Sequence, residues 1–124
     1  MIQSGTLLNV CDNSGAKLVK CIKILGSSKK RYAYLGDILK ISIKKVFFNS
    51  KLKRGEIYNS ILIRSLYNFR RFDGSFISFN SNSVVLLNDK YDFISTRIFG
   101  PVVKELKKNK FFLKKINNLS PNYI

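Results

Sequence analysis

The segment from Ile38 to Val46 alternates apolar and polar residues with a period of two, and this pattern constrains the fold most strongly. Successive side chains of a β-strand point to opposite faces of its sheet. Leu39, Ile41 and Ile43 therefore share one face, which we expect to be buried. The opposite face carries Lys40, Ser42 and Lys44. The alternation predicts a strand with one face in a core and the other in water.

Other segments rich in β-branched residues also predict strands, over 17–25, 57–64 and 83–87. Clusters of Gly, Asn, Asp and Ser end them, because these residues favour turns. The clusters lie at 12–15, 26–28, 36–37, 49–50 and 73–74. Short strands with frequent turns favour an all-β barrel or sandwich. We favour a small barrel, since closure removes exposed strand edges.

The pattern changes after Pro101, where Val-Val-Lys-Glu-Leu-Lys-Lys has helical spacing and good helix formers. Proline suits the first turn of a helix. We therefore predict a short C-terminal helical segment from about 101. A chain of 124 residues is expected to form one domain over 1–124, with a core large enough to fold without metals or disulfides.

The charge of the chain indicates its class of partner. Lys and Arg number 23 against 7 Asp and Glu, which gives a formal charge of +16 and a pI near 10.1. Such a domain repels itself when compact and is stabilised beside a polyanion, either a nucleic acid or an anionic membrane. The membrane is the weaker alternative, because neither a long apolar run nor a basic amphipathic helix is visible. No targeting signal is recognisable near the N-terminus, so we expect the protein to stay where it is made.

Basic residues at loops and on strand faces are the candidate contacts with RNA phosphates. The candidates are Lys29, Lys30, Arg31, Lys40, Lys44, Lys45, Lys51, Lys53, Arg54, Arg70 and Arg71, together with the aromatic residue Tyr32 that follows Arg31. The alternative interpretation of any single lysine is a solvated surface. Tyr32, Tyr67 and Phe72 lie beside basic residues and can stack on an unpaired base. Most other aromatic residues, including Phe47, Phe76 and Phe79, are predicted to pack in the core.

The sequence offers little for catalysis, metal binding or a cofactor. It has no histidine, and its two cysteines are not at zinc-binding spacing. We expect Cys11 and Cys21 to be reduced core residues. The acids are scattered and lie mostly in turns, where a carboxylate caps the local backbone. An enzyme is therefore not expected, and no glycine-rich phosphate loop is present.

Several sequence blocks together resemble one family, the universal large-subunit ribosomal protein L-fourteen, over nearly the whole chain. The blocks, in order, are MIQ at the start, LNVCDNSGAK at 8–17, CIKILG at 21–26, RYAYLGDI at 31–38, RRFDGSFISF at 70–79 and TRIFGPVVKEL at 96–106. Any one block alone is a weak signal. Their order and separation make the resemblance specific.

The resemblance implies a five-stranded β-barrel with a short C-terminal helical region on the inter-subunit side of the large ribosomal subunit. Such a protein contacts large-subunit rRNA, neighbouring ribosomal proteins and, at a bridge, small-subunit rRNA. A ribosome-silencing factor is a further implied partner. The matching partner and bridge positions are Thr96, Arg97, Phe99, Lys115 and Asn118. Asn118 stands where bacterial relatives usually have serine.

Other departures from the family pattern affect local shape. Phe72 replaces a usual proline, Asn49 and Ser50 replace a Pro/Gly hairpin tip, and Cys11 replaces a usual alanine. The chain is also rich in Lys, Asn, Ile, Phe and Tyr, which AT-rich codons encode. We therefore hypothesise an organelle genome, with a mitochondrion favoured over a plastid and an AT-rich bacterium as the alternative.

Two other functions remain as alternatives to a structural rRNA-binding protein. A free-standing oligonucleotide-binding barrel would present aromatic residues on an exposed strand face. The clearest strand instead presents Lys40, Ser42 and Lys44. An enzyme acting on RNA would need a cluster of acids to hold metal ions, and the sequence shows none.

Overall fold

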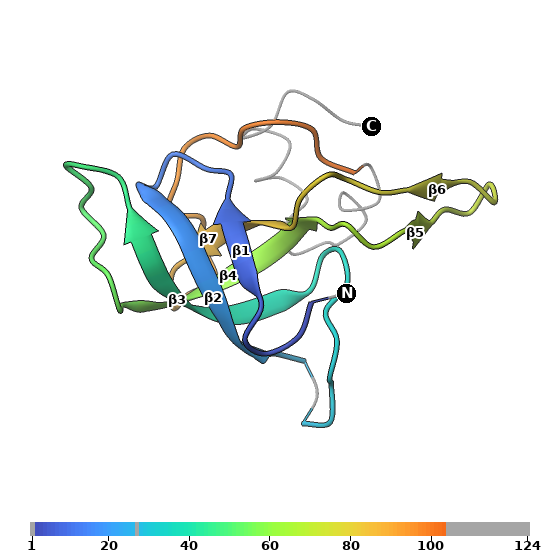
Figure 1. Ribbon diagram of the computed structural model, residues 1–124, viewed down its shortest axis with the longest axis horizontal. Coiled ribbons are helices and arrows are strands. Elements are labelled where there is room, and N and C mark those ends of the chain that lie inside the picture. The colour runs from blue at the N-terminus through green and yellow to red at the C-terminus, as the bar shows by residue number, and fades with distance from the viewer. Residues whose placement is uncertain (1, 27, 104–124) are drawn as a thin grey trace.

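A computed structural model describes residues 2–26 and 28–103 of the chain. The strands are β1 (Leu7–Val10), β2 (Ala16–Ile24), β3 (Ile38–Val46), β4 (Ile57–Arg64), β5 (Phe69–Arg70), β6 (Phe76–Ile77) and β7 (Ser83–Leu87). Five of them close into a barrel in the order β1-β2-β3-β4-β7. The other two, β5 and β6, form a hairpin that projects from the barrel (Figure 1). The prediction of a five-stranded all-β barrel is confirmed.

The central strand β3 shows the predicted two-sided character. Leu39, Ile41 and Ile43 are almost completely buried, whereas Lys40 and Lys44 are exposed. β3 pairs antiparallel with β2 on one side and with β4 on the other. Its apolar face therefore lines the barrel interior and its lysines lie on the outer wall.

The strands β4 and β7 differ from β3 because they are buried on both faces. Leu62, Val84 and Leu86 point into the barrel core. Their neighbours in the sequence, such as Ile61 and Val85, belong to a second apolar cluster. Ile98 and Val102 cover that cluster from the far side, with Tyr91 and Phe93 packed against it. Burial on both faces explains why 61–63 of β4 and 84–87 of β7 are apolar without a break instead of alternating.

The seam between β1 and β7, the parallel pair of the barrel, is short. The Cys11 amide donates to the Val84 carbonyl at 3.2 Å. One residue further on, a carboxylate oxygen of Asp12 accepts a hydrogen bond from the Leu86 amide at 2.9 Å. The other oxygen accepts a bond from the Ser14 amide, which holds the turn that leads into β2. Asp12 thus extends the seam with its side chain while only 4% of its surface is exposed.

The C-terminal helix is not observed within the described residues. Residues 101–103 are not helical, and Val102 lies in a β-bridge conformation. Val102 and Val103 are fully buried, so packing against the barrel competes with the helical pattern there. The rest of the predicted helix lies outside the described residues. Nor does any helix in 2–26 or 28–103 meet the length and hydropathy needed to cross a membrane.

The prediction that the aromatic residues pack in the core is wrong for two of the three. Phe47 is 56% exposed and Phe76 is 63% exposed, while Phe79 is half-buried. Phe47 lies beyond the end of β3, and Phe76 lies on the two-stranded hairpin outside the closed barrel. By contrast, Cys11 and Cys21 are free and buried, as predicted.

Removing the Asp12 carboxylate should weaken the barrel strongly. In Asp12→Ala, the buried Leu86 amide loses its acceptor, and an unsatisfied buried donor costs about 1–3 kcal/mol. With the Ser14 bonds also lost, we expect the free energy of unfolding to fall by about 2–3 kcal/mol. Urea denaturation followed by circular dichroism measures this change. Asp89→Ala, at an exposed turn, should change it by no more than about 0.5 kcal/mol; equal losses would contradict the role of Asp12.

Candidate nucleic-acid interface

Three lysines form a continuous basic surface on the outer wall of the barrel, here named the lysine wall: Lys20 and Lys23 on β2 and Lys40 on β3. The strand register places Lys23 directly opposite Lys40 and Lys20 opposite Ser42. All three lysines are exposed. The barrel thus holds three positive charges on adjacent strands in a fixed arrangement.

The lysine wall has no local neutralising charge. In the described part of the chain, no carboxylate lies within ion-pair distance of Lys20, Lys23 or Lys40. Like charges directly opposite each other across two strands destabilise a sheet, by up to about 1 kcal/mol for a pair. The arrangement is therefore favourable only beside an external anion with charges spaced along a surface, as the phosphates of a nucleic acid are.

The sequence pattern had identified Lys40 but not Lys20 and Lys23. A strict alternation through 17–24 would place Lys20 on one face of the sheet and Lys17 and Lys23 on the other. The observed β2 has irregular register between Ala16 and Val19 and between Cys21 and Lys23. The second irregularity leaves Ile22 and Lys23 both exposed, so lysines three residues apart share the outer face. Bulges of this kind leave no clear signal in a single sequence.

The predicted basic residues at the two ends of β3 lie in separate loops. At one end, Lys51, Lys53 and Arg54 are exposed in the 47–56 connection, where buried Leu52 anchors the loop. Lys44 and Lys45, both exposed, end the strand on that side. Figure 1 shows this connection extending from the barrel away from the β5–β6 hairpin.

The loop before β3 carries a second predicted cluster of RNA-binding residues, at 29–32. Arg31 and Tyr32 are exposed. Lys30 instead makes a 2.9 Å ion pair with Asp37, whose carboxylate also accepts a hydrogen bond from the Tyr34 amide. The ion pair of Lys30 thus stabilises its own loop, whereas the side chains of Arg31 and Tyr32 are exposed to solvent.

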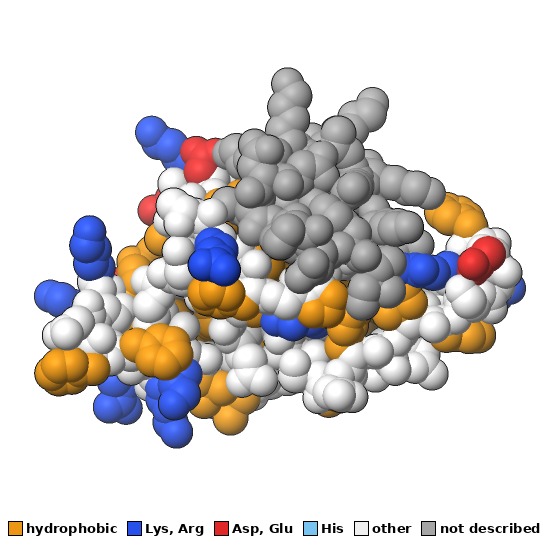
Figure 2. Space-filling model, turned by 90° about the horizontal axis from the view of Figure 1, so that it is seen from above, with side chains coloured by type: hydrophobic (Ala, Val, Ile, Leu, Met, Phe, Trp, Pro, Cys, Tyr) orange, Lys and Arg blue, Asp and Glu red, His pale blue; other side chains and the backbone are white. Residues whose placement is uncertain are grey.

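The hairpin β5–β6 carries Arg70 and Arg71, with Arg70 exposed and Arg71 half-buried. Its turn is held by Asp73, which accepts hydrogen bonds from the Ser75 amide and hydroxyl. These bonds hold the pKa of the Asp73 carboxyl below its ordinary value. Figure 2 shows basic side chains interspersed with exposed hydrophobic ones at both ends of the molecule. The predicted basic residues are divided among the loop before β3, β3 itself, the 47–56 connection and the β5–β6 hairpin.

The segment 96–100, the predicted partner face, is fixed to the turn after β1. The side chain of Asn13 donates to the Thr96 hydroxyl at 2.9 Å and accepts from the Thr96 amide at 3.1 Å. The Phe99 amide donates to the Cys11 carbonyl at 2.7 Å. Arg97 is exposed, and its guanidinium lies 5.3 Å from the centre of the Phe99 ring. Lys115 and Asn118 lie outside the described residues.

Arg64, which the sequence analysis did not identify, supports the same segment from β4. Its guanidinium donates to the Phe99 carbonyl at 3.1 Å and packs directly against Gly100. Gly100 has φ +85°, a conformation that suits glycine. Burial raises the pKa of the nearby Cys11 thiol to about 11, although the Arg64 guanidinium opposes this shift. Cys11 is thus a protonated core thiol at neutral pH and not an activated nucleophile.

Within 2–26 and 28–103, no group of three His, Cys, Asp or Glu side chains is arranged to hold a metal ion. The arrangement that the structure does provide is a rigid barrel with a basic wall and three projecting basic loops. Compared with known families, residues 1–124 match the model described as ribosomal protein L14p/L23e.

A methyl group at Gly100 should disturb the partner face more than one at Gly5. Both glycines have positive φ, so alanine costs about 1–2 kcal/mol at either position. A Cβ at Gly100 would also overlap the Arg64 guanidinium, whereas Gly5 has open space. The guanidinium is the far end of a flexible side chain and can move aside, so the added cost is the loss of its hydrogen bond to the Phe99 carbonyl. We expect Gly100→Ala to lower the free energy of unfolding by about 1 kcal/mol more than Gly5→Ala, as measured by thermal unfolding. Equal effects would show that Arg64 does not support this segment.

Proposed function

Because the chain belongs to the ribosomal protein L14p/L23e family, we propose that it binds large-subunit ribosomal RNA through the lysine wall and the basic loops. Membership makes the chain a structural protein of the large ribosomal subunit, in a family that is not enzymatic. The lysine wall is the observation that carries the proposal, because its charges are held at fixed spacing and have no ion-pair partner among residues 2–26 and 28–103.

The mechanism is electrostatic and geometric. Lysine and arginine side chains neutralise phosphates and release condensed counterions, which makes binding strongly dependent on salt. The closed barrel fixes the spacing of the lysine wall, while the 47–56 connection and the β5–β6 hairpin extend in different directions (Figure 1). One protein can thereby hold separate RNA segments in register, which braces the folded rRNA.

The segment 96–100 is proposed as a protein and bridge face, following what the family resemblance implies. Support comes from its rigidity, because bonds from Asn13, Cys11 and Arg64 hold it in place while Arg97 stays exposed. Its proposed partners are neighbouring ribosomal proteins, small-subunit rRNA at a bridge and a ribosome-silencing factor.

An organelle ribosome, with a mitochondrion favoured over a plastid, is proposed as the location. The support is the abundance of Lys, Asn, Ile, Phe and Tyr, which AT-rich codons encode. Sequencing the DNA that flanks the gene tests this directly. Neighbouring genes of an organelle genome are the expected result, and a bacterial chromosome would contradict it.

Removing the lysine wall should weaken RNA binding without weakening the fold. We expect the triple variant Lys20→Ala, Lys23→Ala, Lys40→Ala to bind a large-subunit rRNA fragment more weakly and to lower the slope of log K against log salt by about one per lysine. Its free energy of unfolding should stay equal or rise by up to about 1 kcal/mol, because like-charge repulsion is removed. Salt titrations of binding and urea denaturation measure the two quantities.

Two single variants serve as controls for the triple variant. Leu7→Ala changes an exposed apolar residue that lies opposite Lys20 in the register. Lys90→Ala removes an exposed positive charge from the turn that also contains Asp89 and Asp92. Both should leave the salt slope within measurement error of the parent protein. A triple variant with an unchanged slope would remove the lysine wall from the RNA interface.

A further inference from the structure

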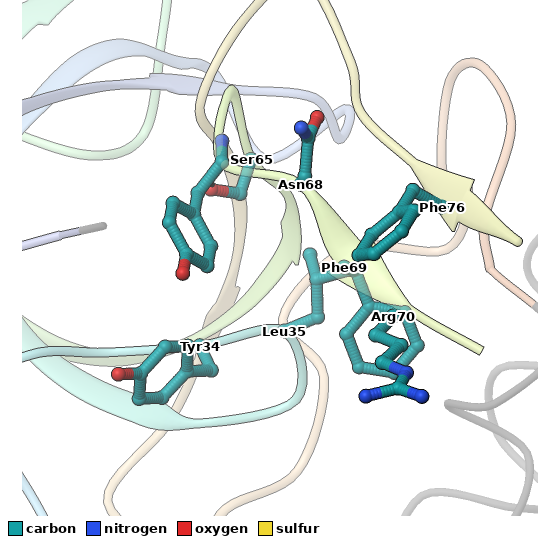
Figure 3. A pocket seen from close by; sticks show the side chains of 8 residues that line it. Tyr34, Leu35, Ser65, Asn68, Phe69, Arg70 and Phe76 are labelled. Carbon is teal, nitrogen blue, oxygen red and sulfur yellow. Dashed lines mark hydrogen bonds between the residues drawn. The ribbon is translucent and has the colours of Figure 1, made fainter. Parts of the chain in front are cut away.

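A pocket of about 460 Å³ lies between the loop before β3 and the base of the β5–β6 hairpin. Half of its lining residues are aromatic: Tyr34 comes from the loop, Tyr67 from the β4–β5 connection, and Phe69 and Phe76 from the hairpin. Figure 3 shows Tyr34 on one side of the pocket and Phe69 with Phe76 on the other. Side chains from distant parts of the chain thus converge on one hollow.

The aromatic walls are unusually exposed for rings of this size. Tyr67 is 47% exposed and Phe76 is 63% exposed, while Tyr34 meets Tyr67 edge to face with ring centres 6.2 Å apart. Gathered apolar surface of this kind marks a binding site, because leaving it in water is unfavourable. The rings therefore present flat apolar faces to a ligand that is itself flat and apolar on its faces.

Besides Ser65, whose hydroxyl oxygen accepts a hydrogen bond from the Tyr67 amide, two polar side chains line the pocket, Asn68 and Arg70. In the described part of the chain, neither side chain has a hydrogen bond or an ion pair. An amide offers two donors and an acceptor, and a guanidinium offers five donors and a positive charge. The pocket thus combines aromatic faces with the Asn68 amide and the Arg70 guanidinium, both of which are available to form hydrogen bonds with a ligand.

We propose that this pocket binds a single unpaired RNA nucleotide, with the base stacked on Tyr67, its edge bonded to Asn68 and its phosphate beside Arg70. Unpaired bases are commonly recognised in this way, splayed out of the RNA and stacked on aromatic side chains. The volume also falls within the range of about 300–1,000 Å³ typical of small-ligand pockets.

An RNA nucleotide fits this pocket better than a segment of another protein. None of the described residues that line the pocket is acidic, and the chain as a whole carries a charge of +16. A phosphate satisfies Arg70, whereas a neutral apolar peptide would bury the guanidinium without a partner, which is costly. The inference rests on the proposed function, since it assigns one RNA contact of the same protein.

The test compares single-stranded and duplex RNA of the same sequence, each labelled with fluorescein, against the full chain by fluorescence anisotropy. Stacking contributes about 1–3 kcal/mol per base, so Tyr67→Ala should weaken single-strand binding between about 5-fold and about 160-fold. Its duplex binding, which depends on phosphate contacts, should change by less than about 2-fold. Tyr67→Phe keeps the ring and should bind single strands as the parent protein does.

Leu66→Ala is the matched control, because Leu66 is exposed next to Tyr67 but does not line the pocket. It should leave both affinities unchanged. Single-strand binding by Tyr67→Ala equal to that of the parent, or an equal loss for duplex, would overturn the pocket assignment while the proposed function stands. Unchanged RNA binding by Tyr67→Ala with lost binding to another ribosomal protein would make the pocket a protein site instead. A parent chain that binds neither RNA would overturn the proposed function as well.

Discussion

Closure of the barrel at the β1–β7 seam is the constraint on which the rest of the structure depends. The seam has few backbone pairs, and the buried Asp12 carboxylate extends it by accepting a hydrogen bond from the Leu86 amide. The same side chain holds the turn that directs the chain into β2. The neighbouring Asn13 binds Thr96 through two hydrogen bonds. The turn after β1 therefore closes the barrel, directs the chain into β2, which carries Lys20 and Lys23, and positions the segment 96–100.

The surface of this barrel is selected for a partner and not for stability. Lys23 and Lys40 lie opposite each other on two strands, with no carboxylate of the described residues in ion-pair contact, and three aromatic rings stand exposed around one pocket. Both features are unfavourable for an isolated protein and favourable beside RNA, because phosphates neutralise the lysines and bases cover the rings. A ribosomal protein functions beside RNA, which explains how the chain tolerates a charge of +16.

Much of the fold could be predicted from the sequence because alternation and turn residues are local signals. The buried and exposed faces of β3 alternate as predicted, and β4 and β7 lie where runs of β-branched residues between turn clusters place them. The exposure of Phe47 and Phe76 could not be predicted, because it depends on which segments lie outside the closed barrel. The pairing of Lys20 with Lys23 on one wall was missed because a register irregularity in β2 turns Lys23 to the face that Lys20 occupies. Arg64 was missed because its role depends on a contact with Gly100, 36 residues away in the sequence.

Lysine footprinting on the large ribosomal subunit tests the central claim most directly. The free protein and intact subunits are treated with an amine-reactive acylating reagent, and the modified lysines are quantified by mass spectrometry. If the lysine wall binds rRNA, Lys20, Lys23 and Lys40 will be modified in the free protein and protected in the subunit. Equal modification of these three lysines in the free protein and in the subunit would contradict the account.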